Sequence, residues 1–293
     1  MFQFLKTKRP EPEPEIVSEP EPPAPPPILV PVLPGLAMRD NGTISLNRLP
    51  DISDWRIGSR FSNILGELNC GRYIHRKDWE YGLCIEGLEK LGVVHPDAQA
   101  LAVGAGYERP LFYFANKVAR MVATDLYDNP DHEGKPAMLT QPWSFSPIEY
   151  RRDRLEVLRM PGNQLEFPDD SFDFLFCLSS IEHFGSREII RQSLDEMKRV
   201  LKPGGIACVI TELILQGPPH HEYFQPDELT SMFLSDPTFP LVGGEMTMNI
   251  SQEMFNLPVS VLSAEDLTSS PHIVLSDGER LWTSASMFLR KPN

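Results

Sequence analysis

Two glycines and an acid are the first residues whose types and spacing predict chemistry. Gly104 and Gly106 follow directly after an apolar run that ends at Val103. Glycine lets a backbone turn tightly and approach a ligand closely. Asp125 ends the next apolar run, where a carboxylate can accept hydrogen bonds from both hydroxyls of a ribose. The pattern favours an adenosine-containing ligand. The alternative is a turn shaped by its glycines, with Asp125 capping a helix.

The same turn argues against a dinucleotide ligand. The third glycine of the dinucleotide fingerprint is absent, because Arg109 stands at its position. A diphosphate needs that close approach and a free helix N-terminus. A hydride-site pattern such as Tyr-x-x-x-Lys is also absent from the sequence. A nicotinamide oxidoreductase therefore remains only as a disfavoured alternative.

Histidines near the ends of two further apolar runs are the candidates for a general base. His183 follows Glu182, and His220, His221 and Glu222 lie together after Gly217-Pro218-Pro219. A positioned imidazole can take a proton from a reacting group. The alternatives are that His183 only orders its loop and that residues 220–222 form a polar connection. The adjacent ligands of that trio lack the usual spacing of a metal site, so no metal is predicted.

Alternating strands and helices must position these residues. Apolar runs predict strands, and apolar residues at helical spacing predict helices. This rhythm implies a parallel sheet with helices on both faces, whose ligands bind at the carboxyl ends of the strands. The expected strands are 98–103, 119–123, 155–160, 172–178, 206–213 and 281–290, and the expected helices are 77–91, 110–117, 187–201 and 226–234. Lys202-Pro203-Gly204-Gly205 is expected to stop the third of these helices.

Composition divides the chain into three parts. Residues 1–34 are rich in proline and glutamate, so we expect an extended, disordered tail. Residues 35–95 are predicted to form a helical lead-in or cap. The remaining residues, 96–293, are predicted to form the ligand-binding domain. Within it, residues 245–275 are expected to be a methionine-containing insertion on the substrate side, or else an irregular surface connection.

Charge and cysteine usage exclude several classes of protein. The net charge is -14, which disfavours broad binding to nucleic acid because that needs clustered Lys and Arg. The four cysteines form no CxxC pair, so a reducing, cytoplasmic setting is expected. No apolar run is long enough to span a bilayer.

Four blocks in order now give a more specific indication: LAVGAGYE at 101–108, ATDLY at 123–127, GNQLEFPDDSFDFLFCLSSIEHF at 162–184 and LDEMKRVLKPGGIACVITEL at 194–213. Together they resemble the class I methyltransferases that depend on S-adenosylmethionine (SAM), especially those with small-molecule or glycan acceptors. The resemblance implies a Rossmann-like α/β fold: a doubly wound, mostly parallel seven-stranded sheet with an antiparallel C-terminal strand.

The resemblance also implies roles for individual residues. Gly104 and Gly106 would line the methionine part of SAM, and Asp125 would bind its ribose. Leu126 would pack on the adenine. The remaining cofactor positions lie at the ends of later strands: Asn163 and Gln164 near the adenine amine, and Ser179 near the sulfonium.

This chain departs from the family pattern at three positions. The acid usual before the first glycine is Ala102, the third loop glycine is Glu108, and the adenine-facing acid is Asn163. We expect Glu108 to contact the amino group of the cofactor in place of the missing acid. The departures also leave open an alternative, a methyltransferase-like module without catalytic activity. Such a module would bind SAM, or no cofactor, and would act on a protein partner through its N-terminal tail.

The expected function is methyl transfer from SAM to an oxygen, or a nitrogen, of a small-molecule or glycan acceptor. The lead-in Arg76–Tyr81 resembles methyltransferases that accompany glycosyl-transfer systems, which favours a sugar oxygen. No nucleic acid and no membrane span are expected.

Overall fold

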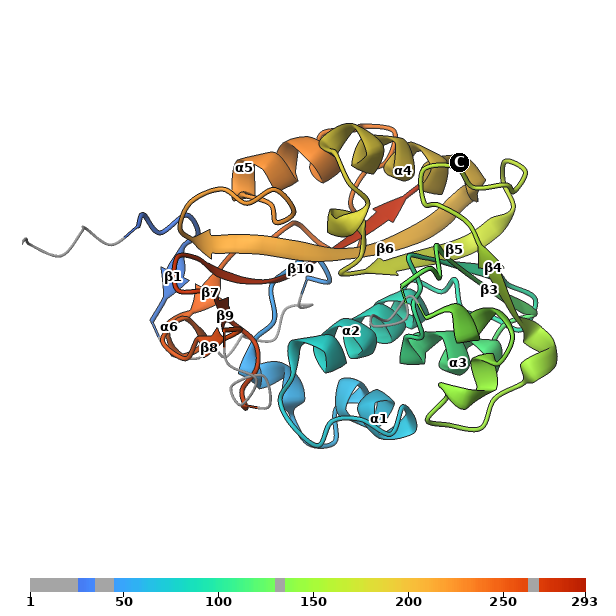
Figure 1. Cartoon of the computed structure of the whole chain (residues 1–293), viewed down its shortest axis with the longest axis horizontal. Coiled ribbons are helices and arrows are strands. Elements are labelled where there is room, and N and C mark those ends of the chain that lie inside the picture. Colours follow the sequence, from blue (N-terminus) through green and yellow to red (C-terminus); the bar gives the residue numbers. More distant parts are fainter. Residues whose placement is uncertain (1–25, 35–44, 130–134, 263–268) are drawn as a thin grey trace, which may run out of the picture.

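A mixed eight-stranded sheet forms the centre of the protein (Figure 1). The computed structural model describes residues 26–34, 45–129, 135–262 and 269–293. The strand order is β4-β3-β2-β5-β6-β10-β9-β8. The strands of this sheet are β2 (Gln99–Val103), β3 (Arg120–Asp125), β4 (Leu155–Arg159), β5 (Phe172–Leu178), β6 (Leu201–Gln216), β8 (Val259–Ser260), β9 (Leu275–Ser276) and β10 (Leu281–Arg290).

The pairing directions confirm the predicted α/β class. Strands β4, β3, β2, β5 and β6 run parallel to their neighbours, and β10 pairs antiparallel with β6. Seven strands were expected, and two-residue strands at one edge bring the number to eight. The chain order reverses between β2 and β5, so their carboxyl ends flank the topological switch point where ligands of such sheets bind.

Helices cover both faces of the sheet, with α1, α2 and α3 on one face and α4 and α5 on the other (Figure 1). Trp79 of α2 and Phe114 of α3 belong to one apolar cluster, while Ile190 and Met197 of α4 belong to the other. The helices are α1 (Arg60–Glu67), α2 (Arg76–Lys90), α3 (Arg109–Ala115), α4 (Arg187–Val200), α5 (Pro226–Leu229) and α6 (Gln252–Phe255). No helix of the described residues is long and apolar enough to cross a bilayer.

Shorter helical turns connect these elements. Most are 3-10 turns, and the segment after α5 is a π-helix. They are η1 (Ile52–Trp55), η2 (Pro136–Leu139), η3 (Pro142–Ser144), η4 (Arg152–Arg154), η5 (Ile181–His183) and η6 (Thr230–Leu234).

Helix α2, which supplies several charged residues of the site, has a capping side chain at its start and a glycine just after its end. The His75 side chain accepts a hydrogen bond from the backbone N–H of Lys77 at its start. Gly92 follows its end with a φ of 76°, a conformation that glycine adopts without steric cost. The predicted helix over 77–91 is thereby confirmed.

Two expectations about local structure need correction. The helix does end before the segment 202–205, at Val200, but the strand expected over 206–213 is longer, because β6 already begins at Leu201 and runs to Gln216. Residues of the proline-rich stretch are also ordered near its end. Strand β1 (Val32–Leu33) pairs with β7 (Ile250–Ser251), because Val30 is buried there against apolar residues. Residues 1–25, the greater part of the expected tail, lie outside the described residues.

Candidate functional site

The glycine turn and the acid lie together at the carboxyl ends of β2 and β3. The Asp125 carboxylate accepts hydrogen bonds from the backbone N–H groups of Gly106 at 3.0 Å and of Tyr127 at 3.2 Å. Gly104 and Gly106 have positive φ angles of 64° and 46°. Asp125 is partly exposed, so its carboxylate both orders the turn and faces the cavity beside it. The predicted juxtaposition is therefore present.

A cavity of about 350 Å³ opens beside this turn. Its described walls contain two aspartates and neither Lys nor Arg. They also contain apolar side chains suited to a planar base. The lining residues are Gly104, Asp125, Leu126, Asp128, Asn129, Met160, Pro161, Gly162, Asn163, Ser180, His183, Phe184 and Ile189. Such walls fit an uncharged nucleoside or a cation better than a diphosphate.

Phe184 and Ser180 shape this cavity, and the sequence did not point to them. A Cβ placed on Gly104 would lie 2.2 Å from the Ser180 hydroxyl and 2.9 Å from the Phe184 ring, and one on Gly162 would lie 2.5 Å from that ring. The two glycines therefore make room for Phe184. The only sequence signal was that both residues stand beside the Ser179 and His183 positions already singled out.

The residues expected near the adenine are only partly brought together. Leu126 and Asn163 line the cavity. The Leu126 side chain is 49% exposed, so an apolar surface is open to a planar ligand. Gln164 is exposed and does not line the cavity. Gly106 is also absent from the lining, and it contributes its N–H to Asp125 instead.

His183 lies in the cavity wall and has a carboxylate partner. Its Nδ1 is 2.9 Å from Oε1 of Glu222. Burial lowers the pKa of His183, but the nearby carboxylates of Glu182 and Glu222 outweigh that effect and raise the pKa above its ordinary value. A carboxylate partner favours the neutral tautomer with the proton on Nδ1, which leaves Nε2 as a proton acceptor.

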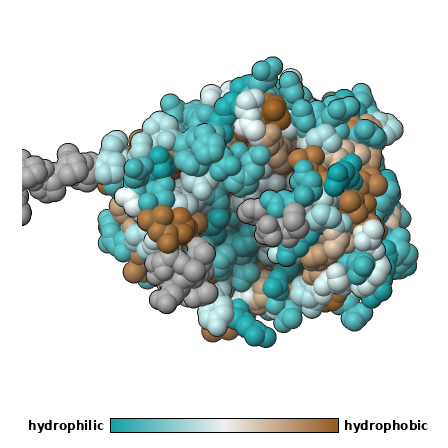
Figure 2. Space-filling model, viewed as in Figure 1, coloured by the Kyte–Doolittle hydropathy of each residue, from teal (hydrophilic) through white to brown (hydrophobic). Residues whose placement is uncertain are grey.

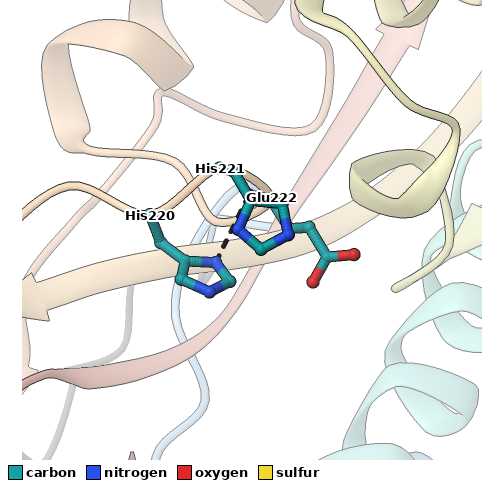
Figure 3. Close-up of side chains that lie close together, drawn as sticks. All are labelled: His220, His221 and Glu222. Carbon is teal, nitrogen blue, oxygen red and sulfur yellow. Dashed lines mark hydrogen bonds between the residues drawn. The ribbon is translucent and has the colours of Figure 1, made fainter.

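His220 and His221 do not line this cavity, although Figure 3 shows them close to Glu222. The ligand atoms of these three residues lie within 4.8 Å of one another. Nδ1 of His220 accepts weak hydrogen bonds from the backbone N–H groups of Glu222 and Tyr223, at 3.3 and 3.4 Å. In a neutral ring this places the proton on Nε2. Glu222 is also engaged by His183.

A buried charge cluster lies on the other side of the strand ends. It consists of Arg76, Lys77, Glu80, Glu108, Glu182 and Glu212. Arg76 pairs with Glu212 at 2.6 Å and with Glu80 at 3.3 Å. Burial, followed by the Glu212 carboxylate, raises the pKa of Glu182 to about 7, while the Thr211 hydroxyl donates to its Oε2 at 2.9 Å.

Ser179 and Glu108, both predicted to contact the cofactor, belong to the surroundings of this cluster. The Ser179 hydroxyl donates to Oε1 of Glu80 at 2.8 Å. Oε1 of Glu108 lies 2.6 Å from the Lys77 ammonium. Although burial opposes it, the charges of Lys77 and Arg76 hold the pKa of Glu80 below its ordinary value. Helix α2 therefore supplies charges at the strand ends, a role that helical spacing alone did not indicate.

A second, larger cavity of about 810 Å³ lies beside Lys77. Tyr107 and Arg109, which follow the glycine turn, line it together with Lys77 and Tyr81 of α2. Figure 2 shows this face of the molecule hollowed near its centre, with a mainly hydrophilic floor.

Comparison with known proteins identifies a methyltransferase segment. Residues 101–209 match the family described as "Methyltransferase domain". The chain is 25% identical to the sterol 24-C-methyltransferase of Yarrowia lipolytica over 138 residues, covering 45% of this chain and 33% of that protein. It is 44% identical to "Probable methyltransferase ltbC" of Aspergillus luteorubrus over 48 residues, covering 15% of this chain and 17% of that protein. The chain thus spans a third or less of the length of these curated relatives.

Solved structures of methyltransferases are also similar. One is the 1,6-didemethyltoxoflavin-N1-methyltransferase of Burkholderia thailandensis, solved with 1,6-didemethyltoxoflavin and S-adenosylhomocysteine. Its sequence identity is 16% and its TM-score is 0.45, with 80% of this chain and 87% of that chain covered.

Proposed function

Because residues 101–209 form a methyltransferase domain of the class I, SAM-dependent type, we propose that the chain methylates an oxygen atom of a small-molecule or glycan acceptor. SAM is the cofactor of this domain. When bound, SAM supplies a methyl group on a positively charged sulfur, which is already a good leaving group. The residues of the chain have to bind the cofactor, align the acceptor, exclude water and remove a proton.

The smaller cavity fits the adenosyl part of SAM. Asp125 stands where ribose hydroxyls can donate to it, and Leu126 offers an apolar surface to the base. Two aspartates and no described Lys or Arg line this cavity, so its potential favours a cationic sulfonium over an anionic diphosphate. We assign Gly104, Asp125, Leu126 and Asn163 to cofactor binding on these grounds.

The observation that supports an oxygen acceptor is the His183–Glu222 pair, whose histidine lies in the wall of that cavity. An alcohol or a phenol must lose its proton as it is methylated, whereas a neutral amine can attack without a base. Glu222 holds Nδ1 of His183, so Nε2 can take the hydroxyl proton and the carboxylate can stabilise the imidazolium that forms. We assign His183 as the general base and Glu222 as its orienting partner.

The net charge of the chain is our reason for choosing between classes of acceptor. The net charge of -14 repels a polyanion, which favours a small molecule or a glycan over nucleic acid. The four cysteines are free, and we propose a reducing, cytoplasmic setting. A protein partner that binds the N-terminal tail remains a separate proposal.

Transfer of labelled methyl groups tests this function. The full chain is incubated with methyl-labelled SAM and a panel of phenols, sugars and sterols, and products are identified by mass spectrometry. We expect a methyl ether. We also expect His183→Ala to lower kcat by roughly 100-fold to 10,000-fold, with little change in the affinity for S-adenosylhomocysteine.

The matched control is His95→Ala, because His95 is exposed and outside both cavities. Its turnover should equal that of the wild type. Full turnover by His183→Ala rejects the base assignment. SAM binding without transfer to any acceptor favours the alternative of a binding module, which the departures at Ala102 and Asn163 motivate.

A further inference from the structure

The loop after β6 brings two histidine rings and a carboxylate together (Figure 3). The ring centroids of His220 and His221 lie 4.3 Å apart. Ligand atoms of these two residues and of Glu222 all lie within 4.8 Å of one another. The spacing of the three residues along the chain predicted no metal, yet the loop brings both imidazoles close to one carboxylate.

Each of the three side chains has a ligand atom to offer. The His221 ring is exposed and makes no hydrogen bond among the described residues. Oε1 of Glu222 holds His183, and Oε2 has no hydrogen bond within the part of the chain that the structure describes. The hydrogen bonds to Nδ1 of His220 are 3.3 and 3.4 Å long, at the long end of the range for such bonds, so a coordinate bond can replace them.

The chemistry of these ligands suits zinc. Two imidazole nitrogens and one carboxylate oxygen are a ligand set that zinc accepts, with a fourth position left for water. Metal–ligand distances of about 2.0–2.2 Å place the ligand atoms of a tetrahedral site about 3.4 Å apart. Rotation of the Glu222 side chain, which is 31% exposed, toward the two rings can close the remaining distance. Magnesium and calcium prefer oxygen ligands and fit this set poorly.

Contacts outside the trio hold the loop in place. The His220 ring stacks on Tyr223 at 4.2 Å, and Tyr223 stacks on the buried Trp282 at 4.9 Å between centroids. Arg187 of α4 donates to the backbone carbonyl oxygens of Glu222 and Tyr223, at 2.8 and 3.0 Å. An ion therefore meets a backbone and a ring that are already positioned, which lowers the entropic cost of binding it.

We propose that His220, His221 and Glu222 bind a zinc ion, and that the bound ion draws Glu222 away from His183. The binding is independent of the proposed function, whereas the effect on His183 rests on it. An ion that attracts the Glu222 carboxylate competes with the hydrogen bond that orients the imidazole of His183. Zinc should therefore inhibit methyl transfer without displacing the cofactor, because none of its three ligands lines the smaller cavity.

Calorimetry with zinc chloride on the full chain, free of any affinity tag, measures the site directly. We expect one zinc ion per chain, and magnesium chloride should give no comparable heat. His221→Ala should weaken zinc binding by at least roughly 100-fold, since loss of a residue that only supports a metal ligand already costs roughly 10-fold to 100-fold. His95→Ala is the matched control, because His95 is an exposed histidine outside the trio, and it should bind zinc like the wild type.

The same zinc titration during methyl transfer tests the effect on His183. Saturating zinc should lower the turnover of the wild type by roughly 10-fold or more, a part of what a general base contributes, and a chelator should restore it. Without zinc, His221→Ala should turn over like the wild type, and it should resist zinc concentrations that inhibit the wild type. Unchanged affinity for S-adenosylhomocysteine shows that the variant is folded.

Each part of the proposal has results that overturn it. The zinc site is wrong if the wild type binds no zinc, or if His221→Ala binds zinc as tightly as the wild type. Full turnover of the zinc-loaded wild type overturns the effect on His183. A chain that transfers methyl groups to no acceptor overturns the proposed function, whereas calorimetry still decides on the zinc site.

Discussion

The two cavities beside the glycine turn are built in different ways. The smaller one is lined mostly by residues of two short segments, Asp125–Asn129 and Met160–Asn163, together with the loop after β5. The charge cluster beside the larger one joins residues as distant in sequence as Glu80 and Ser284, whose hydroxyl donates to Oε1 of Glu80 at 2.6 Å. On the proposed function, backbone turns and two aspartates form the nucleoside side, whereas the charge cluster is formed by ion pairs between distant elements.

This difference indicates how each side should respond to substitution. A change on the nucleoside side should affect every adenosine ligand equally, because all of them share that part. A change in the charge cluster should affect the pH dependence of the folding stability. Four variants test this division, from the largest expected effect to the smallest.

Asp125→Ala should have the largest effect on binding. It removes the proposed acceptor for the ribose hydroxyls and the partner of the Gly106 N–H. We expect roughly 100-fold weaker binding, since hydrogen bonds to a charged group contribute about 1.5–3 kcal/mol. Calorimetry should show the same loss for S-adenosylhomocysteine and 5′-methylthioadenosine, with the exposed Asp97→Ala as control. A loss confined to one ligand contradicts the division.

Gly104→Ala, a change beside the smaller cavity, should lower the stability of the folded protein. A φ of 64° is unfavourable for alanine, and the Phe184 ring would have to move away from the new methyl group. We expect the free energy of unfolding to fall by about 1–3 kcal/mol, measured by urea titration. Gly66→Ala is the matched control, because its methyl group meets open space on α1 and should stabilise by up to about 1 kcal/mol. Equal stability of both variants would reject this account of the turn.

Glu182→Gln tests the charge cluster through pH. Burial and Glu212 raise the pKa of Glu182 to about 7 from an ordinary value of 4.5. The folded state then keeps a proton that the unfolded state loses between these values, so the stability of the wild type falls as pH rises from 4.5 to 7. Glutamine removes this loss and can still accept from Thr211. Above pH 7 the variant should be more stable by about 1–3 kcal/mol, and the two proteins should converge near pH 4.5 in urea titrations.

Glu222→Gln should produce the smallest change, a shift in the pH profile of turnover. His183 acts as a base only when neutral, so kcat should rise with pH through its pKa, which Glu222 helps to raise. Removal of this carboxylate lowers that pKa, and the acidic limb should move to lower pH by less than about one unit. If the acidic limb of the kcat profile stays at the same pH, Glu222 takes no part in the proton transfer. Glu228→Gln is the control, because Glu228 pairs with Arg187 instead.

The sequence predicted the lining of the smaller cavity better than the charge cluster. Gly104, Asp125 and Asn163 were expected at one site and line that cavity together, because a motif links residue type to position along a few neighbouring residues. Their contact with the cofactor stays a prediction. Phe184 and Ser180 were missed because their role is to fill the space above glycines on other loops, which only packing reveals. Lys77 was noticed within a helix, but the side chains it would meet could not be inferred.

The amino-acid sequence by itself determined the alternation of strands and helices, the tight turn and the acid that ends β3, because apolar periodicity and glycine act over a few residues. Only the tertiary structure decided that α2 would place Arg76, Lys77 and Glu80 beside the end of β5 and beside residues within β6 and β10. Ion pairs of this kind depend on distances between elements far apart in the chain. Those distances are set by how the helix packs on the sheet, which no local pattern records.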